Sequence, residues 1–315
     1  MSKITISENI EQMSPKGQDH TVSGETTIDG IVVTYAAVFD GHGENPVIHF
    51  IRSIPKNALN EIMAMPCPAT TLFHLINQQT PKLCETGRCS GSTMCLARIF
   101  PTHVEIINVG DSQAVVYKNG EIEFVSETHD YCNEKEKARL HADGLVYQVL
   151  DSSSVKIVNK SEMRKTKAFY IRHLNDGVTL AVSQALGHNG KTGICPDRTV
   201  IPYFPSDRVD IILGSDGLFD MVLRELDSDA FVESDLLEML DMSGQEIMKR
   251  ACDRWVQEWI MYYDLDNPNK SAKYQWDRSS SDDVAVVKAL VIGLNVSVGD
   301  VAGGDVATGD SVFQM

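Results

Sequence analysis

The chain has 315 residues, 43% of them hydrophobic, and 28 lysines and arginines against 44 aspartates and glutamates give a formal net charge of −16. This length accommodates one large domain or two average ones. The acidic balance argues against nucleic acid as a partner, because nucleic-acid-binding surfaces carry basic stripes. Most of the acidic residues are expected to form a solvated surface, and some could gather around cations.

The cysteines and the N-terminal segment indicate where in the cell the protein is expected. The seven cysteines are odd in number and include no C-x-x-C pair, so we interpret them as reduced thiols. The polar N-terminus lacks the apolar core of a signal peptide, and no apolar run reaches the length of a membrane span. We therefore expect a soluble monomer in the cytoplasm, with a nuclear location also open and no membrane partner.

In chain order, the first strong element is the apolar run at residues 31–39, IVVTYAAVF, which predicts a buried strand leading into a loop at residues 40–43. Asn119-Gly120 predicts a hairpin turn of type I′, because both residues tolerate positive φ angles. Further strands are predicted at residues 92–100, 104–117, 121–125, 146–158, 168–174, 178–183, 209–213 and 283–292, and helices at 45–65, 69–84, 134–141 and 233–263.

The order of these elements indicates the fold class. Strands come in runs joined by hairpins and the helices are segregated, which predicts an α+β fold. We expect two antiparallel sheets packed as a sandwich, with helices on both outer faces. Residues 264–282 are polar and predict a loop. Residues 1–293 are expected to form the domain, and the Gly/Val/Asp-rich residues 294–315 a flexible tail.

Aspartates recur at the ends of apolar strands, often beside glycine. Several carboxylates in one place repel each other unless a cation lies between them, and oxygen ligands select hard ions such as Mg²⁺ or Mn²⁺. For any single Asp-Gly pair an ordinary turn is the alternative. Asp111 could likewise simply cap a turn, and spacing alone does not bring these residues together. The candidates are Asp19, Asp40, Asp130, Asp216 and Asp282.

An ordered series of segments runs through nearly the whole chain up to about residue 293. The series resembles the protein phosphatase 2C family of metal-dependent phosphatases, whose fold is a pair of antiparallel sheets between helices. The matching segments are VFDGHG (38–43), SGST (90–93), INVGDSQAVV (107–116), ETHD (127–130), EKARL (136–140), LAVSQALG (180–187), ILGSDGLFDM (212–221) and SDDVAVV (281–287).

The resemblance implies a set of metal ligands. By this similarity Asp40 bridges two cations, Mg²⁺ or Mn²⁺, and Gly41 lends its carbonyl oxygen to one of them. Asp216 and Asp282 complete the first site, and Asp19 matches the aspartate of the family's N-terminal acidic pair.

The resemblance also implies a mechanism and a substrate class. Paired cations activate a water that attacks phosphoserine or phosphothreonine in protein substrates, without a covalent phosphoenzyme. Asp130 matches an aspartate associated with a third, weaker metal. His42 is similar to the family histidine that is proposed to protonate the leaving oxygen.

The sequence departs from the family mainly at positions expected to bind the substrate phosphate. The family usually has an arginine five residues before the aspartate of its acidic pair, where Ser14 stands here. Lys16 could substitute for it, as a point charge without bidentate geometry. Gln18 replaces the usual first acid of the pair, and His188 replaces the aspartate that commonly ends ALGD.

Three functions therefore stay open at the level of sequence. The first is a metal-dependent protein serine/threonine phosphatase. The second is a catalytically weakened pseudophosphatase, a scaffold that binds a phosphoprotein or kinase partner. The third is a two-metal hydrolase of small phosphate esters. Metal titration separates the scaffold from the two enzymes, and comparing phosphopeptide with nucleotide substrates separates the enzymes from each other.

Overall fold

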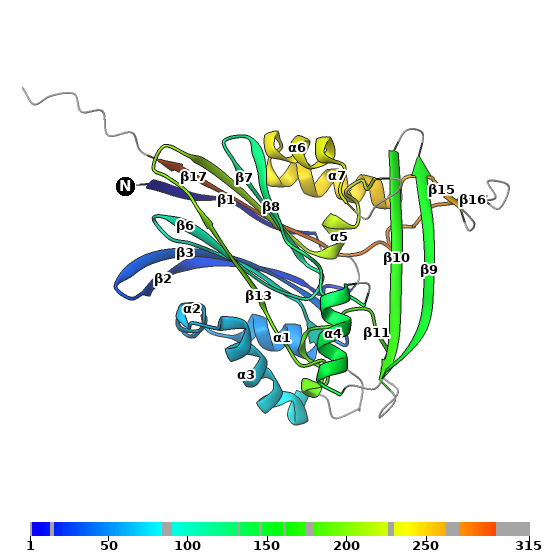
Figure 1. Ribbon diagram of the computed structural model, residues 1–315, viewed down its shortest axis with the longest axis horizontal. Coiled ribbons are helices and arrows are strands. Elements are labelled where there is room, and N and C mark those ends of the chain that lie inside the picture. Colours follow the sequence, from blue (N-terminus) through cyan, green and yellow to red (C-terminus); the bar gives the residue numbers. More distant parts are fainter. Residues whose placement is uncertain are drawn as a thin grey trace, which may run out of the picture.

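Two antiparallel sheets pack face to face with helices outside each of them, and a third sheet stands at one side (Figure 1). This arrangement confirms the predicted α+β sandwich. The computed structural model describes residues 2–12, 16–83, 90–131, 133–144, 147–159, 162–173, 179–225, 230–262 and 271–293. The predicted tail at residues 294–315 lies outside the described residues. In the described part, no helix is both long and apolar enough to span a membrane.

The elements follow in chain order. The strands are β1 (Ser2–Gln12), β2 (Asp19–Ile28), β3 (Ile31–Gly43), β4 (Ser90–Ser92), β5 (Met94–Ile99), β6 (His103–Val109), β7 (Gln113–Lys118), β8 (Glu121–Val125), β9 (Tyr147–Asn159), β10 (Glu162–His173), β11 (Thr179–Leu180), β12 (Leu186–Gly187), β13 (Asp197–Pro202), β14 (Arg208–Gly214), β15 (Trp259–Tyr262), β16 (Ser271–Tyr274) and β17 (Val284–Gly293). The helices are α1 (Pro46–Ser53), α2 (Lys56–Ala64), α3 (Pro68–Leu83), α4 (Glu134–Ala142), α5 (Asp216–Phe219), α6 (Glu233–Asp241) and α7 (Gly244–Val256), with a 3₁₀ turn at His188–Gly190.

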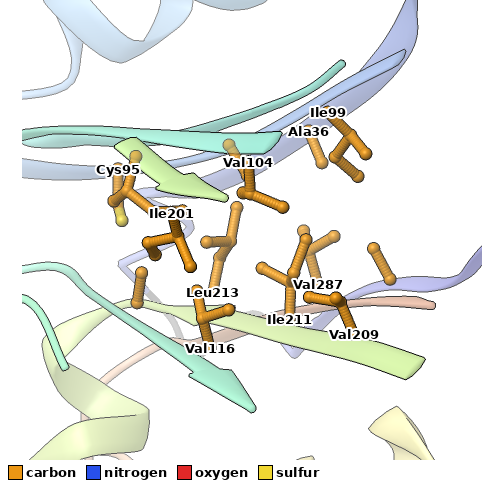
Figure 2. Close-up of a cluster of buried hydrophobic side chains, with 14 of the residues drawn as sticks. Ala36, Cys95, Ile99, Val104, Val116, Ile201, Val209, Ile211, Leu213 and Val287 are labelled. Atoms are coloured by element: carbon orange, nitrogen blue, oxygen red, sulfur yellow. The ribbon is translucent and has the colours of Figure 1, made fainter. Parts of the chain in front are cut away.

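The sandwich consists of one sheet in the order β1-β17-β14-β7-β8 and a second in the order β12-β4-β3-β5-β6-β13, with β2 also on β3. Figure 2 shows the core between them, where Val116, Leu213 and Val287 of the first sheet face Ala36 and Val104 of the second. Full burial of such aliphatic side chains stabilises the fold by about 1.5–3 kcal/mol each, which holds the sheets together.

Both sheets are also covered on their outer faces. Helices α1–α3 bury the outer face of the second sheet, and α5–α7 bury that of the first (Figure 1). Alternate residues of a strand point to opposite faces. Ala36 and Val38 of β3 therefore join the inner core, whereas Tyr35, Ala37 and Phe39 join the outer one. Burial on both faces explains why residues 35–39 are continuously apolar, whereas Ile31 and Val32 at the start of the strand are exposed.

One predicted strand and two predicted helices are divided. The predicted helix at 45–65 becomes α1 and α2, with Ile54 and Pro55 between them. The predicted strand at 104–117 becomes β6 and β7, which belong to different sheets, because Gly110 turns the chain with φ +97°. The predicted helix at 233–263 becomes α6, α7 and β15. Ser243 starts α7 anew, since its side chain and that of Glu246 form a reciprocal capping box.

The turn between β7 and β8 is as predicted, with φ +56° at Asn119 and +90° at Gly120.

The third sheet, in the order β11-β10-β9-β15-β16, was not predicted as a separate sheet. It includes β16, which lies inside the predicted loop at 264–282, and residues 264–270 of that loop lie outside the described residues.

Candidate metal centre

The predicted aspartates meet at one end of the sandwich. The register of β2 and β3 sets Asp19 directly opposite Asp40. Asp216 follows β14 as the first residue of α5, and Asp282 stands two residues before β17. Because β14 and β17 are neighbours in the first sheet and β3 lies in the second, the two sheets deliver these carboxylates to a common edge.

Glycines allow the close backbone approach that the sequence predicts. A Cβ atom on Gly217 would lie 1.8 Å from the carbonyl oxygen of Asp283, so only glycine lets the turn after Asp216 pack against the Asp282–Asp283 turn. A Cβ atom on Gly41 would lie 3.0 Å from the carbonyl oxygen of Gln18. The Asp-Gly pairs therefore serve a packing need at this edge of the sandwich.

The electrostatics show that the carboxylates are close together. Burial and then the charge of Asp216 raise the pKa of Asp40 well above its usual range, with a further contribution from Asp19. Burial and then the charges of Asp282 and Asp111 raise the pKa of Asp216 well above its usual range. A hydrogen bond between Asp40 and Asp216 favours the protonated form of Asp40. Such a buried, mutually repelling set is stabilised by a cation.

Asp111 also belongs to this cluster, although the sequence allowed it to be a simple turn cap. Burial, followed by the charge of Asp220, raises the pKa of Asp111 to about 7, and Asp130 and Asp282 add to the rise. The charge of Asp220 also raises the pKa of Asp216. The INVGDSQAVV and GLFDM segments contain these two acids, but their spacing gives no sign that they face Asp216.

Hydrogen bonds hold two of the predicted ligands in place. Asp19 is 1% exposed, and its Oδ2 accepts a hydrogen bond of 2.6 Å from the Ser215 hydroxyl. Asp130 accepts bonds from the Thr128 hydroxyl (2.9 Å) and from the Asn133 backbone N–H (3.1 Å). Outer partners of this kind orient carboxylates for a metal.

Lys16, which follows Ser14 by two positions in the sequence, lies at the cluster. Its Nζ is 2.7 Å from Oδ1 of Asp282. Burial tends to lower the pKa of Lys16, but the bond to Asp282 and the charges of Asp216 and Asp40 raise it overall. Ser14, the other residue of this prediction, lies outside the described residues.

His42 follows Asp40 and Gly41 on β3, and its ring contacts a second histidine. Its Nε2 is 2.7 Å from Nε2 of His188, and the rings stack with centroids 4.8 Å apart. Burial lowers the pKa of His42 to about 4, against a smaller opposing effect of a hydrogen bond to the backbone of Asp40. The ring is therefore neutral at neutral pH.

The donor set fits hard divalent cations in its chemistry. Among the described residues, no three His, Cys, Asp or Glu side chains already converge on one point in a ligating arrangement. The carboxylates nevertheless lie close enough to raise each other's pKa, and all are oxygen donors, as Mg²⁺ and Mn²⁺ prefer. Such ions would be held by Asp40, Asp216, Asp282 and the Gly41 carbonyl oxygen. Asp19 lies opposite Asp40 in the strand register.

Comparison with known proteins shows which family this chain is similar to. The family model of protein phosphatase 2C matches residues 18–258. A rice protein, probable protein phosphatase 2C 54, is 26% identical over 238 residues, which cover 73% of this chain and 61% of that protein. Human protein phosphatase 1B is 32% identical over 147 residues, which cover 43% of this chain and 26% of that protein. The match therefore spans only part of each relative.

Solved structures share the fold. The serine-threonine phosphatase 2C of Toxoplasma gondii has a TM-score of 0.54 and 16% identity, with 92% of this chain and 94% of that chain covered. A serine/threonine phosphatase of S. agalactiae has a TM-score of 0.52 and 16% identity, with 93% and 99% covered. At these identities the likeness concerns the fold. Since the family model runs through well over half of the chain, this chain belongs to the protein phosphatase 2C family.

Proposed function

We propose that this chain is a metal-dependent protein serine/threonine phosphatase that uses Mg²⁺ or Mn²⁺. The observation that carries the proposal is the half-buried pair Asp40 and Asp216, whose pKa values are raised by desolvation and by the charges of neighbouring carboxylates. A protein retains such a costly arrangement of carboxylates where a cation relieves it. When bound, paired divalent cations supply an activated water and offset the charge on the phosphoryl oxygens.

Lys16 is proposed to bind the substrate phosphate. Its Nζ pairs with Oδ1 of Asp282 at 2.7 Å. If a cation bound to that carboxylate, the ammonium group would become available to a phosphoryl oxygen near the same edge. A lysine contributes charge there without the bidentate geometry of arginine, so we expect weaker orientation of the phosphate.

His42 is proposed to act on the leaving serine or threonine oxygen. Burial lowers the pKa of its ring to about 4, so the neutral imidazole is the form present at neutral pH. A neutral ring still carries one N–H group. Because Nε2 of His42 contacts His188, the group that can donate a hydrogen bond to the leaving oxygen, as negative charge develops on it, is the N–H at Nδ1.

The test is hydrolysis of a phosphoserine peptide with Mn²⁺, with Mg²⁺ and with excess chelator, with metal binding measured by calorimetry in parallel. We expect turnover that requires metal and is lost in Asp40→Asn. Asp253→Asn on the exposed face of α7 is the matched control, since that residue pairs only with Lys249 in the described structure. Turnover at the full rate in chelator would refute the proposal. Metal binding without turnover would instead support the scaffold function.

A further inference from the structure

Three strands place His42 beside the segment that carries His188. In the register, His42 of β3 lies opposite Gly91 of β4, and Gly91 lies opposite Gly187 of β12. His188 directly follows Gly187. A single row across the sheet therefore brings a residue of the metal-site strand next to a residue 146 positions later in the chain.

The two imidazoles make a short and specific contact. The Nε2 atoms are 2.7 Å apart, and the ring planes are inclined by 28°. His188 is 1% exposed, so its ring is held inside the protein. A hydrogen bond between two Nε2 atoms needs one proton, with one ring as donor and the other as acceptor. The contact therefore requires opposite protonation of the two Nε2 atoms: when His188 donates from Nε2, His42 accepts at Nε2 and carries its own proton on Nδ1.

The backbone around the pair is shaped to allow this contact. His188 has φ +48°, a left-handed conformation that residues with a Cβ atom seldom adopt, and Gly187 before it has φ +101°. At Gly91, an added Cβ atom would lie 2.3 Å from Nε2 of His188 and 2.8 Å from Nε2 of His42. Only glycine leaves room for both rings. Unusual backbone of this kind tends to cluster at functional sites.

We propose that His188 is a positioning residue that holds the His42 ring in one orientation and one tautomer beside Asp40 and Gly41. The kinetic consequence rests on the proposed phosphatase function, whereas the effect on the tautomer does not. A ring that could flip and exchange tautomers would spend only part of its time in the productive arrangement. For histidines that ligate a metal, loss of the outer partner that orients the ring typically costs about 10- to 100-fold in metal affinity or activity, and we expect a loss of similar size for His42.

The first test needs no turnover. The ring nitrogens of ¹⁵N-histidine-labelled protein are observed by NMR in wild type and in His188→Asn, without metal and again with Mg²⁺. Asparagine tolerates the left-handed backbone, so this variant should fold, but its shorter side chain does not reach His42. We expect a single His42 tautomer in wild type and a mixture in the variant. An unchanged tautomer in His188→Asn would overturn the proposal, whether or not the protein proves to be a phosphatase.

The second test is a double-mutant cycle on kcat with a phosphoserine peptide. We expect His188→Asn to lower kcat about 10- to 100-fold with little change in KM, and to have no further effect in a His42→Ala background. A merely structural role would give additive losses. Gly91→Ala disturbs the pair while keeping both histidines, and should reproduce the His188→Asn effect. Asn189→Gly is the control, because Asn189 is exposed and has the same left-handed backbone. Additive losses in the cycle, or an equal loss in this control, would contradict the assignment.

Discussion

The charge of Asp111 should make the metal-free protein less stable as pH rises. Burial, assisted by neighbouring charges, raises the pKa of this carboxyl from 3.8 to about 7 in the folded chain. The folded state then binds more protons than the unfolded state between about pH 4 and pH 7. Below about pH 4 the carboxyl is protonated in both states and does not change the free energy of unfolding. Its destabilising effect grows as the pH rises to about 7. At 1.36 kcal/mol per pH unit this amounts to at most about 4 kcal/mol at pH 8.

Asp111→Asn removes the charge and keeps the size of the side chain. We expect it to raise the unfolding free energy of the chelator-treated protein at pH 8 by about 2–4 kcal/mol, because neighbouring carboxyls share part of the cost. At pH 4.5 the gain should be under about 1 kcal/mol. Urea denaturation across this pH range measures the gain in unfolding free energy, with Asp253→Asn as the control. Saturating Mg²⁺ should shrink the pH dependence. A gain that does not increase with pH would refute the electrostatic reasoning.

The remaining predictions concern catalysis. Asp40→Asn should abolish metal-dependent phosphopeptide hydrolysis and leave the chelator-treated fold as stable or more stable; near wild-type turnover at saturating metal would show the ligand assignment to be wrong. His42→Ala should slow hydrolysis of phosphoserine more than that of p-nitrophenyl phosphate, whose leaving group needs no assistance; equal losses would indicate another role. Lys16→Met should raise KM for the phosphopeptide about 10-fold or more. It should also tighten metal binding about 2- to 5-fold in calorimetry, since the partly exposed pair with Asp282 is worth about 0.5–1 kcal/mol. Weaker metal binding in Lys16→Met would contradict a competition between the lysine and the metal.

Much of the fold follows from local sequence. A strand segment buried on both faces must be continuously apolar, so the run at residues 35–39 identified the core of β3 correctly. Asn119-Gly120 identified its turn because few other residues adopt two consecutive positive φ angles. The Asp-Gly pairs at 40 and 216 identified two positions where the backbone packs closely. These features depend on neighbours within a few residues, and such neighbours can be read from the chain directly.

Other features depend on which distant segments the sandwich brings together. Lys16 meets Asp282 across 266 positions, because β2 and β17 both begin at the same edge of the sandwich. Asp111 faces Asp220 and Asp216 only because β6 and β7 separate into different sheets at Gly110. The contact of His42 with His188 needs three strands in register and a glycine between the rings. The sequence by itself determined the kinds of residues at the site, whereas only the tertiary structure decided which of them meet, because strand pairing and sheet packing set distances that spacing along the chain does not contain.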